Sequence, residues 1–576
     1  MIIQSIVLDS LHAYDEMYFR GGFCHSGYNK ASYLSLKKGE RVSFDTYYNS
    51  LFVGILKKYT SATKVLISLQ ITGTARLSLC TYDGKNEKIV AEKTDTGCVF
   101  LETELSLLDE NAILYPVIYA QSELNILGGE YSCDATPSKL SVSVAICTYK
   151  REMAVLRNIE VLRTLKGVLD AVYIIDNGQT LDLPSDDFIK IIPNKNLGGS
   201  GGFTRGLIEA SGGNHSHVIL MDDDIEIKKE TIFRMVALTS IFKDEYKNAH
   251  ISASMLPFSK PYIQFEAGAR FNGQHIVSFK QGLDLTRRSS IIENLKQDRV
   301  EYGAWWCFML PLSDVDSFGL PLPLFIKFDD VEYGTRCCKN APIITSNGIC
   351  VLHEDFDAKY SPHLEYYTIR NQLITLSTQG KKGALNGILR LAKVSAKHLF
   401  LYRYDLMPLI FKAFEDFLKG SSLLLTTDEE ALNKEIMALA PRAIPLNEIQ
   451  GWNNELRKPY EPKRRSFLSK LLQALTLGGH LVPSFMLKKK ISAFPLSNAK
   501  VGSAFLRKKT IQYQLGSDFG YSYNRSVRGF FKWFFKCFSL SFKLLFKYGR
   551  AKRSFMNSRE LLTSLEFWKR HLEIDR

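Results

Sequence analysis

The segment VILMDDDIEI (residues 218–227) decides the fold, because four apolar residues run directly into three adjacent aspartates. The apolar run is typical of a buried strand, whereas aspartate is a poor strand former and adjacent carboxylates repel one another. Carboxylates at the end of a buried strand are tolerated when a divalent cation binds there, and oxygen ligands suit Mg²⁺ or Mn²⁺. We therefore expect Asp222 and Asp224 to point to one side and bind a metal. The alternative is a solvated turn.

The segments that precede these aspartates predict an α/β domain with a parallel sheet. Apolar strands at residues 140–151, 171–178 and 188–194 alternate with helical segments, and each strand ends in polar residues. Ligands bind at the carboxyl ends of the strands in such sheets. Those ends carry Arg151, Asp176, Asn196 and residues 222–224, so we expect a ligand site along this edge.

The segment NLGGSGGFTRG (residues 196–206) is a glycine-rich loop between a strand and a helix. It matches neither a dinucleotide-binding fingerprint nor a Walker loop. Glycines such as Gly198 and Gly199 permit close approach to a ligand, and the start of a helix can bind anions. We expect a diphosphate here, with a flexible turn as the alternative.

Two further motifs predict an acceptor side. In GAWWCFMLP (residues 303–311), Trp305 and Trp306 cannot both face one core if the segment is extended, so we expect one ring to line a cleft and stack on a sugar. The alternative is that both rings pack in the core. In LFIKFDDVEYGTR (residues 324–336), we expect Asp329 and Asp330 to follow an apolar strand, which makes them candidates for a general base. The alternative there is an acidic helix start.

The histidine in VLHEDF (residues 351–356) follows another apolar strand. A single histidine at such a position is more often structural, but beside two aspartates His353 could be a third metal ligand. A cation, a diphosphate site, a stacked ring and a base together describe sugar transfer from a nucleotide-sugar donor. In that reaction Asp330 would deprotonate an acceptor hydroxyl, and a single displacement predicts inversion at the anomeric carbon.

The two ends of the chain differ from this middle region. Alternating apolar residues in KVLISLQI (residues 64–71) predict short strands and a β-sandwich or barrel, and the pattern after residue 385 is mainly helical. We predict an N-terminal β-sandwich at 1–138, a catalytic domain at 139–385 and a helical region at 386–576. Ten scattered cysteines without a CxxC pair favour a reducing cytoplasm.

The C-terminal region is strongly basic. Residues 461–576 hold 24 Lys and Arg against 6 Asp and Glu, which predicts an anionic partner. On a helical wheel, residues 528–550 place their lysines on a narrow stripe beside a wide aromatic face. That pattern favours a helix in the membrane interface over nucleic-acid binding; the alternative is a helix packed on the protein. We expect no signal peptide and no membrane-spanning helix, hence a cytoplasmic protein at the inner face of the membrane.

The ordered motifs CTYKR, NLGGSGGFTRG, MDDDI, GAWWCFMLP, FIKFDDVEYGTR and VLH resemble the bacterial polymerising galactofuranosyltransferases, which are inverting enzymes of glycosyltransferase family 2 with a GT-A (Rossmann-like) fold. The resemblance implies UDP-galactofuranose as donor, a lipid-linked glycan of the cell envelope as acceptor, Mn²⁺ or Mg²⁺ as cofactor, and a possible homo-oligomer. It implies Asp330 as catalytic base and Asp222, Asp224 and His353 as metal ligands. The implied donor-binding residues are Arg151, Asp176, Asn196, Gly198, Gly199, Asp222 and Asp223, and the implied acceptor-binding residues are Trp305, Trp306, Glu266 and Asp329.

Three alternatives remain open from the sequence. The same fold could use another nucleotide sugar, such as a rhamnosyl or hexosyl donor, because donor choice depends on pocket shape. A nucleotidyltransferase also needs aspartate-bound metal and a glycine loop, but it leaves the tryptophan pair unexplained. A glycan-binding scaffold would not require Asp330. The residues after His353 are Glu-Asp-Phe where the family has more apolar ones, so the acceptor, the linkage and the number of sugars added also stay open.

Overall fold

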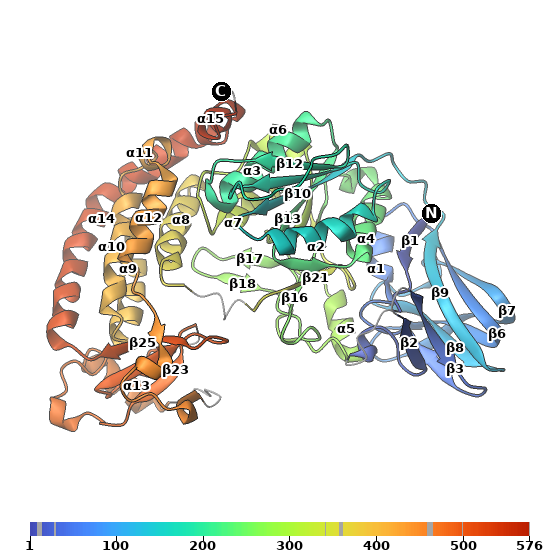
Figure 1. The fold of residues 1–576 in the computed structure, drawn as a ribbon, viewed down its shortest axis with the longest axis horizontal. Coiled ribbons are helices and arrows are strands. Elements are labelled where there is room, and N and C mark those ends of the chain that lie inside the picture. Colours follow the sequence, from blue (N-terminus) through green and yellow to red (C-terminus); the bar gives the residue numbers. More distant parts are fainter. Residues whose placement is uncertain are drawn as a thin grey trace. The chain divides into compact units, whose positions relative to one another are not determined.

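The computed structural model describes residues 1–8, 14–27, 30–339, 341–355, 361–457, 465–497 and 499–574. The chain forms two compact units. The first comprises Met1–Pro321, Asp330–His353 and the residues after His571; the second comprises Leu322–Asp329 and Glu354–His571. Figure 1 colours both along the sequence.

The first unit begins with a β-rich region, as predicted. Nine strands form one sheet around β6 (Lys64–Tyr82), which pairs along its length with β7 (Glu87–Glu104). On its other edge, β6 pairs first with β9 (Leu124–Cys133) and then with β8 (Ile113–Ala120). The alternation in the sequence is the cause, because Val65, Ile67 and Leu69 are buried on one face. The remaining strands are β1 (Ile2–Ser5), β2 (Phe23–Gly27), β3 (Lys30–Leu36), β4 (Arg41–Ser43) and β5 (Leu51–Phe52), with helix α1 (Val53–Tyr59) after β5.

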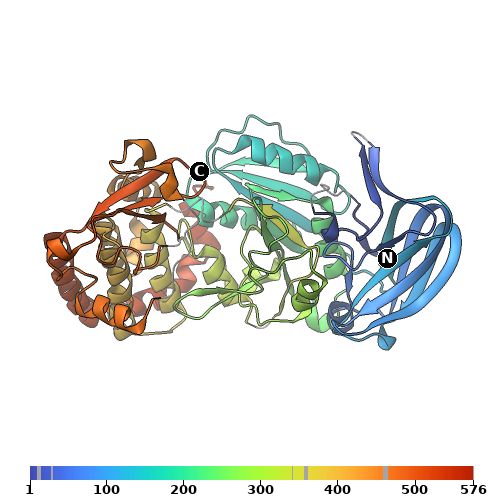
Figure 2. The same cartoon turned by 90° about the horizontal axis from the view of Figure 1, so that it is seen from below.

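The predicted α/β region follows and contains a seven-stranded sheet in the order β12-β11-β10-β13-β19-β15-β20. The first four strands are parallel: β12 (Ile189–Pro193), β11 (Ala171–Asp176), β10 (Val142–Thr148) and β13 (His217–Asp222). Their carboxyl ends therefore meet at one edge. The other three are β19 (Cys307–Pro311), β15 (His250–Ser252) and β20 (Ile343–Ile344). Figure 2 shows this sheet beside the blue N-terminal strands of the same unit.

Helices α2 (Glu152–Arg163), α3 (Gly198–Gly212) and α4 (Lys229–Ser240) alternate with the parallel strands. The glycine-rich segment corrects one expectation, since α3 begins at Gly198 and most of the glycines lie inside the helix rather than in a loop. A Cβ on Gly202 would lie 2.1 Å from Cys147 Sγ, and one on Gly206 would lie 2.5 Å from Ala145 Cβ. These two glycines let α3 pack closely on β10, so their function here is helix–sheet packing.

A three-stranded sheet lies next to the edge at which the parallel strands end. Strand β21 (Cys350–His353) pairs antiparallel with β14 (Ile225–Ile227) and parallel with β16 (Ser254–Pro257). In this register His353 is the partner of Ile225, the residue that follows Asp224. Backbone pairing between distant segments therefore brings the histidine to the aspartates.

The second unit is mainly helical, as predicted. Its longest helix, α14 (Val527–Leu562), contacts α8 (Leu364–Thr378), α9 (Ala384–Phe400) and α10 (Met407–Phe417). This unit also contains a four-stranded sheet that the sequence did not predict, formed by β22 (Ile444–Pro445), β25 (Phe519–Asn524), β24 (Lys509–Tyr513) and β23 (Ser492–Pro495). No helix within the described ranges has the length and apolarity needed to cross a bilayer.

The expected strand before Asp329 is instead a loop in the second unit. Phe325, Lys327 and Phe328 have left-handed backbone angles, with φ of 67°, 68° and 69°, which are unfavourable for side chains with a Cβ. Asn371, which is fully buried in α8, holds this loop. Its Nδ2 donates to the carbonyls of Leu324, Ile326 and Lys327 at 2.8–2.9 Å.

Candidate active site

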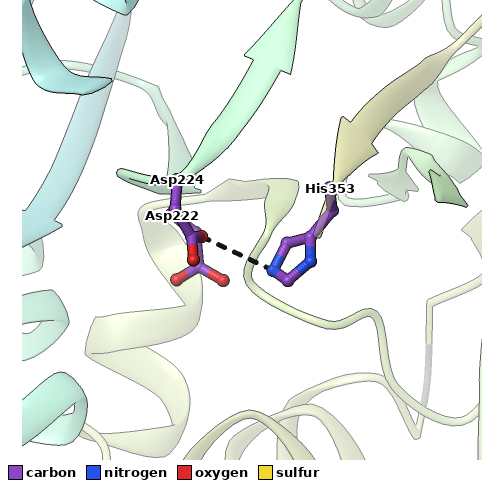
Figure 3. A group of neighbouring side chains, drawn as sticks. All are labelled: Asp222, Asp224 and His353. Atoms are coloured by element: carbon purple, nitrogen blue, oxygen red, sulfur yellow. Dashed lines mark ion pairs between the residues drawn. The ribbon is translucent and has the colours of Figure 1, made fainter. Parts of the chain in front are cut away.

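Asp222, Asp224 and His353 form a compact group at the carboxyl edge of the parallel sheet. One ligand atom from each lies within 4.8 Å of the others. His353 Nε2 is 3.5 Å from Asp224 Oδ1, and Figure 3 shows the imidazole directed toward the carboxylates. Two carboxylates and one imidazole are a suitable donor set for a divalent cation that keeps its other positions for water and phosphate oxygens. The residues therefore fit Mn²⁺ or Mg²⁺.

The middle aspartate has different partners. Asp223 Oδ2 accepts a hydrogen bond from Thr148 Oγ1 at 2.8 Å, and its other oxygen lies 3.2 Å from Arg151 Nη1. Burial raises the pKa of Asp223, while Arg151 and Thr148 oppose that shift. Arg151 also forms an ion pair with Asp224. Arg151 thus offsets part of the negative charge of the group, and Thr148, which the sequence analysis missed, orients Asp223.

The other predicted donor residues shape the loops at the same edge. Asp176 is 2% exposed and accepts hydrogen bonds from the backbone N–H groups of Gly178, Thr180 and Leu181. Asn196 Oδ1 accepts a bond from the Gly198 N–H at the start of α3, 3.2 Å away, and Gly199 follows in the first turn. These contacts fix the loops after β11 and β12. Contact of these residues with a donor stays a prediction.

The carboxyl of Glu266 is much more deeply buried than those of Asp222 and Asp224. Glu266 is 4% exposed, and its carboxylate accepts a hydrogen bond from Ser278 Oγ. Burial, with a smaller contribution from the charge of Asp330, raises the pKa of Glu266 to about 7, while the Ser278 hydrogen bond opposes the shift. Burial also raises the pKa of Tyr302, with contributions from the charges of Asp330 and Glu266. Glu266, Tyr302 and Asp330 therefore act on one another electrostatically, and Tyr302 is a residue that the sequence analysis missed.

Asp330 lies in the first turn of helix α7 (Asp329–Cys337), where its Oδ1 accepts a bond from the Val331 N–H at 2.7 Å. It is partly exposed, unlike Glu266. A Cβ on Gly334 would lie 2.4 Å from Tyr302 Cβ, so this glycine lets α7 pack closely against Tyr302. Asp329, the predicted acceptor residue, begins the helix. The two aspartates therefore form an acidic helix start, which was the alternative to carboxylates that follow a strand. Asp330 is still partly exposed at this position, and a general base needs that exposure to reach an acceptor hydroxyl.

Both tryptophans are buried, which is the alternative given above to a ring that lines a cleft. Trp305 and Trp306 lie in a turn before β19 and are 3% and 6% exposed. Trp306 donates its indole N–H to the Ala253 carbonyl at 2.8 Å. Trp305 packs edge-on against Phe203 and Tyr333, and its indole N–H has no acceptor among the described residues. The pair belongs to the core because the turn lets both rings point inward; an acceptor role for either stays a prediction.

Comparison with known families agrees with this geometry. The family described as Galactofuranosyltransferase 2 N-terminal matches residues 25–134, and Glycosyl transferase family 2 matches residues 143–243. The second match includes the parallel strands and the three aspartates. The α/β region is therefore similar to the family 2 glycosyltransferases, and the comparisons support a glycosyltransferase with the GT-A fold.

The resemblance of the chain to the galactofuranosyltransferases is confirmed by two curated relatives. Galactofuranosyltransferase GlfT2 of Mycobacterium tuberculosis is 26% identical over 439 residues, which cover 69% of this chain and 68% of that protein. Galactofuranosyltransferase GlfT1 of the same species is 24% identical over 272 residues, 42% of this chain and 85% of that protein. The solved structure of mannosyltransferase PcManGT from Pyrobaculum calidifontis, in complex with GDP-Man and Mn²⁺, is 13% identical. It covers 53% of this chain and 83% of that one with a TM-score of 0.29, too low to carry an inference about this chain.

Proposed function

We propose that the chain transfers galactofuranose from UDP-galactofuranose to a hydroxyl of a lipid-linked glycan in cell-surface polysaccharide synthesis, with inversion and with a divalent metal. The observation that carries the proposal is the group of Asp222, Asp224 and His353, whose ligand atoms lie within 4.8 Å of one another at the carboxyl edge of the sheet. The relatives named galactofuranosyltransferase favour this sugar over a rhamnosyl or hexosyl donor.

On the donor side, Asp222, Asp224 and His353 would hold Mn²⁺ or Mg²⁺. When bound, the ion would offset the negative charge that develops on the leaving diphosphate. Arg151 would add a second positive group at the same edge, because it already lies against Asp223 and Asp224. The backbone N–H groups at the start of α3 would also face anionic oxygens.

On the acceptor side, Asp330 would accept the proton of the acceptor hydroxyl while that oxygen attacks the anomeric carbon and UDP leaves. A single displacement of this kind inverts the configuration. Glu266, with a pKa raised to about 7 by burial, would be partly protonated at neutral pH and could donate a hydrogen bond to the acceptor. Two nearby carboxyls with different environments thus suit two different tasks.

The chain would act at the cytoplasmic face of the membrane. One face of α14 packs on helices α8, α9 and α10 of the same unit. The opposite face carries five apolar side chains that are each more than half exposed: Phe535, Phe538, Phe542, Leu545 and Phe546. Four lysines lie along one flank of this exposed face: Lys532, Lys536, Lys543 and Lys547. An exposed aromatic face beside a cationic stripe is typical of a helix that lies in the membrane interface, where it would meet a lipid-linked acceptor.

The test is incubation of the full chain with UDP-galactofuranose, Mn²⁺ and a synthetic lipid-linked galactoside, followed by mass spectrometry of the lipid. We expect a gain of one or more hexose units, which Asp330→Asn slows by about a thousandfold and Asp182→Asn, at an exposed loop position, does not. Parallel reactions with UDP-glucose and a rhamnosyl nucleotide test the donor. Faster transfer from either, or no transfer by the folded protein, would contradict the proposal. Light scattering of the purified protein tests the predicted homo-oligomer.

A further inference from the structure

Helices α10 and α14 of the second unit enclose a groove of about 590 Å³. Its aromatic floor is formed by Phe411 of α10 and Trp533 of α14, whose ring centres are 5.2 Å apart. Four lysines line it: Lys412 of α10, Lys419 just after α10, and Lys536 and Lys543 of α14. The groove therefore combines an apolar base with converging positive charges.

The carboxylates in this groove do not cancel its positive charge. Four lysines line it against Glu415 and Asp416. Asp416 is 2% exposed and is satisfied by the Tyr366 hydroxyl at 2.7 Å and by Lys412 and Lys419 at 3.2 and 2.6 Å. These contacts lower the pKa of Asp416 despite its burial, so its carboxylate stays ionised and holds two lysines at the groove.

The two lysines of α14 are the ones available to a ligand. Lys543 pairs with Glu415 at 2.8 Å, but both side chains are about half exposed, so solvent screens this pair and the attraction is weak. Lys536 Nζ lies 4.6 Å from the centre of the Trp533 ring, which is a cation–π contact. The N–H groups of the ammonium that point away from the ring can donate to a ligand. Both ammonium groups can turn toward an anion.

The position of the groove on α14 indicates which anion it would meet. On a helical wheel the exposed aromatic face lies opposite the packed face, and the stripe of Lys532, Lys536, Lys543 and Lys547 lies between the two. A helix whose apolar face is buried in the interface keeps such a flank at the level of the lipid headgroups. Tryptophan also prefers that level.

We propose that the groove between α10 and α14 binds the phosphate headgroup of an anionic phospholipid. The inference rests on the membrane attachment proposed above and adds a defined site to it. Lys536 and Lys543 would donate to the phosphate oxygens, while Trp533 and Phe411 would contact the glycerol and the start of the acyl chains. The site differs from diffuse attraction, because only some of the lysines on the stripe line the groove.

That difference gives a matched pair of variants. Lys536→Gln/Lys543→Gln removes two charges that line the groove, and Arg528→Gln/Lys547→Gln, the stripe variant, removes two exposed charges from the same flank of α14 that do not line it. The full chain is titrated with phosphatidylcholine vesicles that do or do not contain phosphatidylglycerol. We expect the stripe variant to bind the anionic vesicles about thirtyfold more weakly than the wild type, which is the diffuse loss for two charges, and the groove variant to lose at least about tenfold more. Equal losses for both variants would overturn the site and leave only diffuse electrostatics.

A second titration separates this inference from membrane attachment itself. Monomeric dihexanoyl phosphatidylglycerol is added to the full chain while tryptophan fluorescence is measured, with inorganic phosphate as the parallel probe and Trp533→Phe to identify the signal. A saturable change with the lipid, absent in Lys536→Gln/Lys543→Gln, supports the site even if the chain binds no vesicles, in which case only the attachment proposal fails. No saturable change, or the same change with inorganic phosphate, would overturn the headgroup site.

Discussion

The proposed donor and acceptor sides of the first unit contain similar residues in opposite environments. On the donor side, Asp222 and Asp224 are partly exposed, and Arg151 and His353 lie against Asp224. On the acceptor side, Glu266 is almost completely buried, and its pKa is raised to about 7 by that burial. The first arrangement favours ionised carboxylates around a cation, and the second favours a carboxyl that exchanges a proton near neutral pH. The environment, more than the residue type, determines what each carboxyl can do.

The largest expected effect separates the two sides. Asp330→Asn should lower kcat by about a thousandfold, because an amide cannot accept the proton of the acceptor hydroxyl. The affinity for UDP should be unchanged, since Asp330 is proposed to act on the acceptor and not on the donor. Steady-state rates and calorimetric UDP titration measure both quantities, with Asp182→Asn as the control. A parallel loss of UDP affinity would show that the two sides are not separate.

The next prediction concerns the pH dependence of stability. Glu266 has a pKa of about 7 in the folded chain against 4.5 ordinarily, so the folded state binds more protons between these values. Its contribution to stability is fully present below about pH 4.5 and is lost as the pH rises through about 7, a loss of about 3 kcal/mol. Glu266→Gln should remove this part of the pH dependence in urea unfolding at pH 5 and pH 8. Glu123→Gln, at an exposed position, should leave it intact, and an unchanged slope in Glu266→Gln would contradict the assignment.

A pair of glycines tests the packing on each side. Gly202→Ala would press α3 away from β10, and Gly334→Ala would press α7 away from Tyr302. Each should destabilise the protein by about 2 kcal/mol. We expect Gly202→Ala to weaken UDP binding and Gly334→Ala to lower kcat. Gly212→Ala is the control, because a Cβ there meets no atom within 4 Å. If Gly202→Ala and Gly334→Ala changed UDP affinity and kcat in the same way, the proposed separation of the donor and acceptor sides would be contradicted.

The smallest predicted effect concerns the histidine. His353→Ala should lower the affinity for Mn²⁺ about tenfold, because it removes one ligand and leaves both carboxylates. Calorimetric titration with MnCl₂ measures this change, and His275→Ala, at an exposed loop position, is the control. If Mn²⁺ affinity is the same in His353→Ala and the wild type, the histidine is a structural residue.

The sequence predicted the features that depend on local pattern. Apolar runs that end in polar residues located four parallel strands and the edge where Asp222 and Asp224 lie. The position of His353 followed from the same rule applied to residues 351–353, and the pairing of β14 with β21 then places it beside Asp224.

The features that were missed depend on tertiary contacts. Residues 324–328 read as a strand, but the side chain of Asn371, more than forty residues away, stabilises a left-handed loop there. The glycines of α3 looked like a ligand loop, whereas Cys147 and Ala145 on β10 explain Gly202 and Gly206. Tyr302 carries no motif of its own. Its importance comes from the charges of Glu266 and Asp330, which only the folded chain brings into range.

Calorimetric titration of UDP into the full chain, with Mn²⁺ and then with excess chelator, tests the central claim most directly. If Asp222, Asp224 and His353 hold a cation that contacts the diphosphate, UDP should bind in the presence of Mn²⁺ and lose most of its affinity with chelator. In the presence of Mn²⁺, Asp222→Asn should bind UDP as weakly as the wild type does with excess chelator. Equal UDP affinity under both conditions would contradict the account.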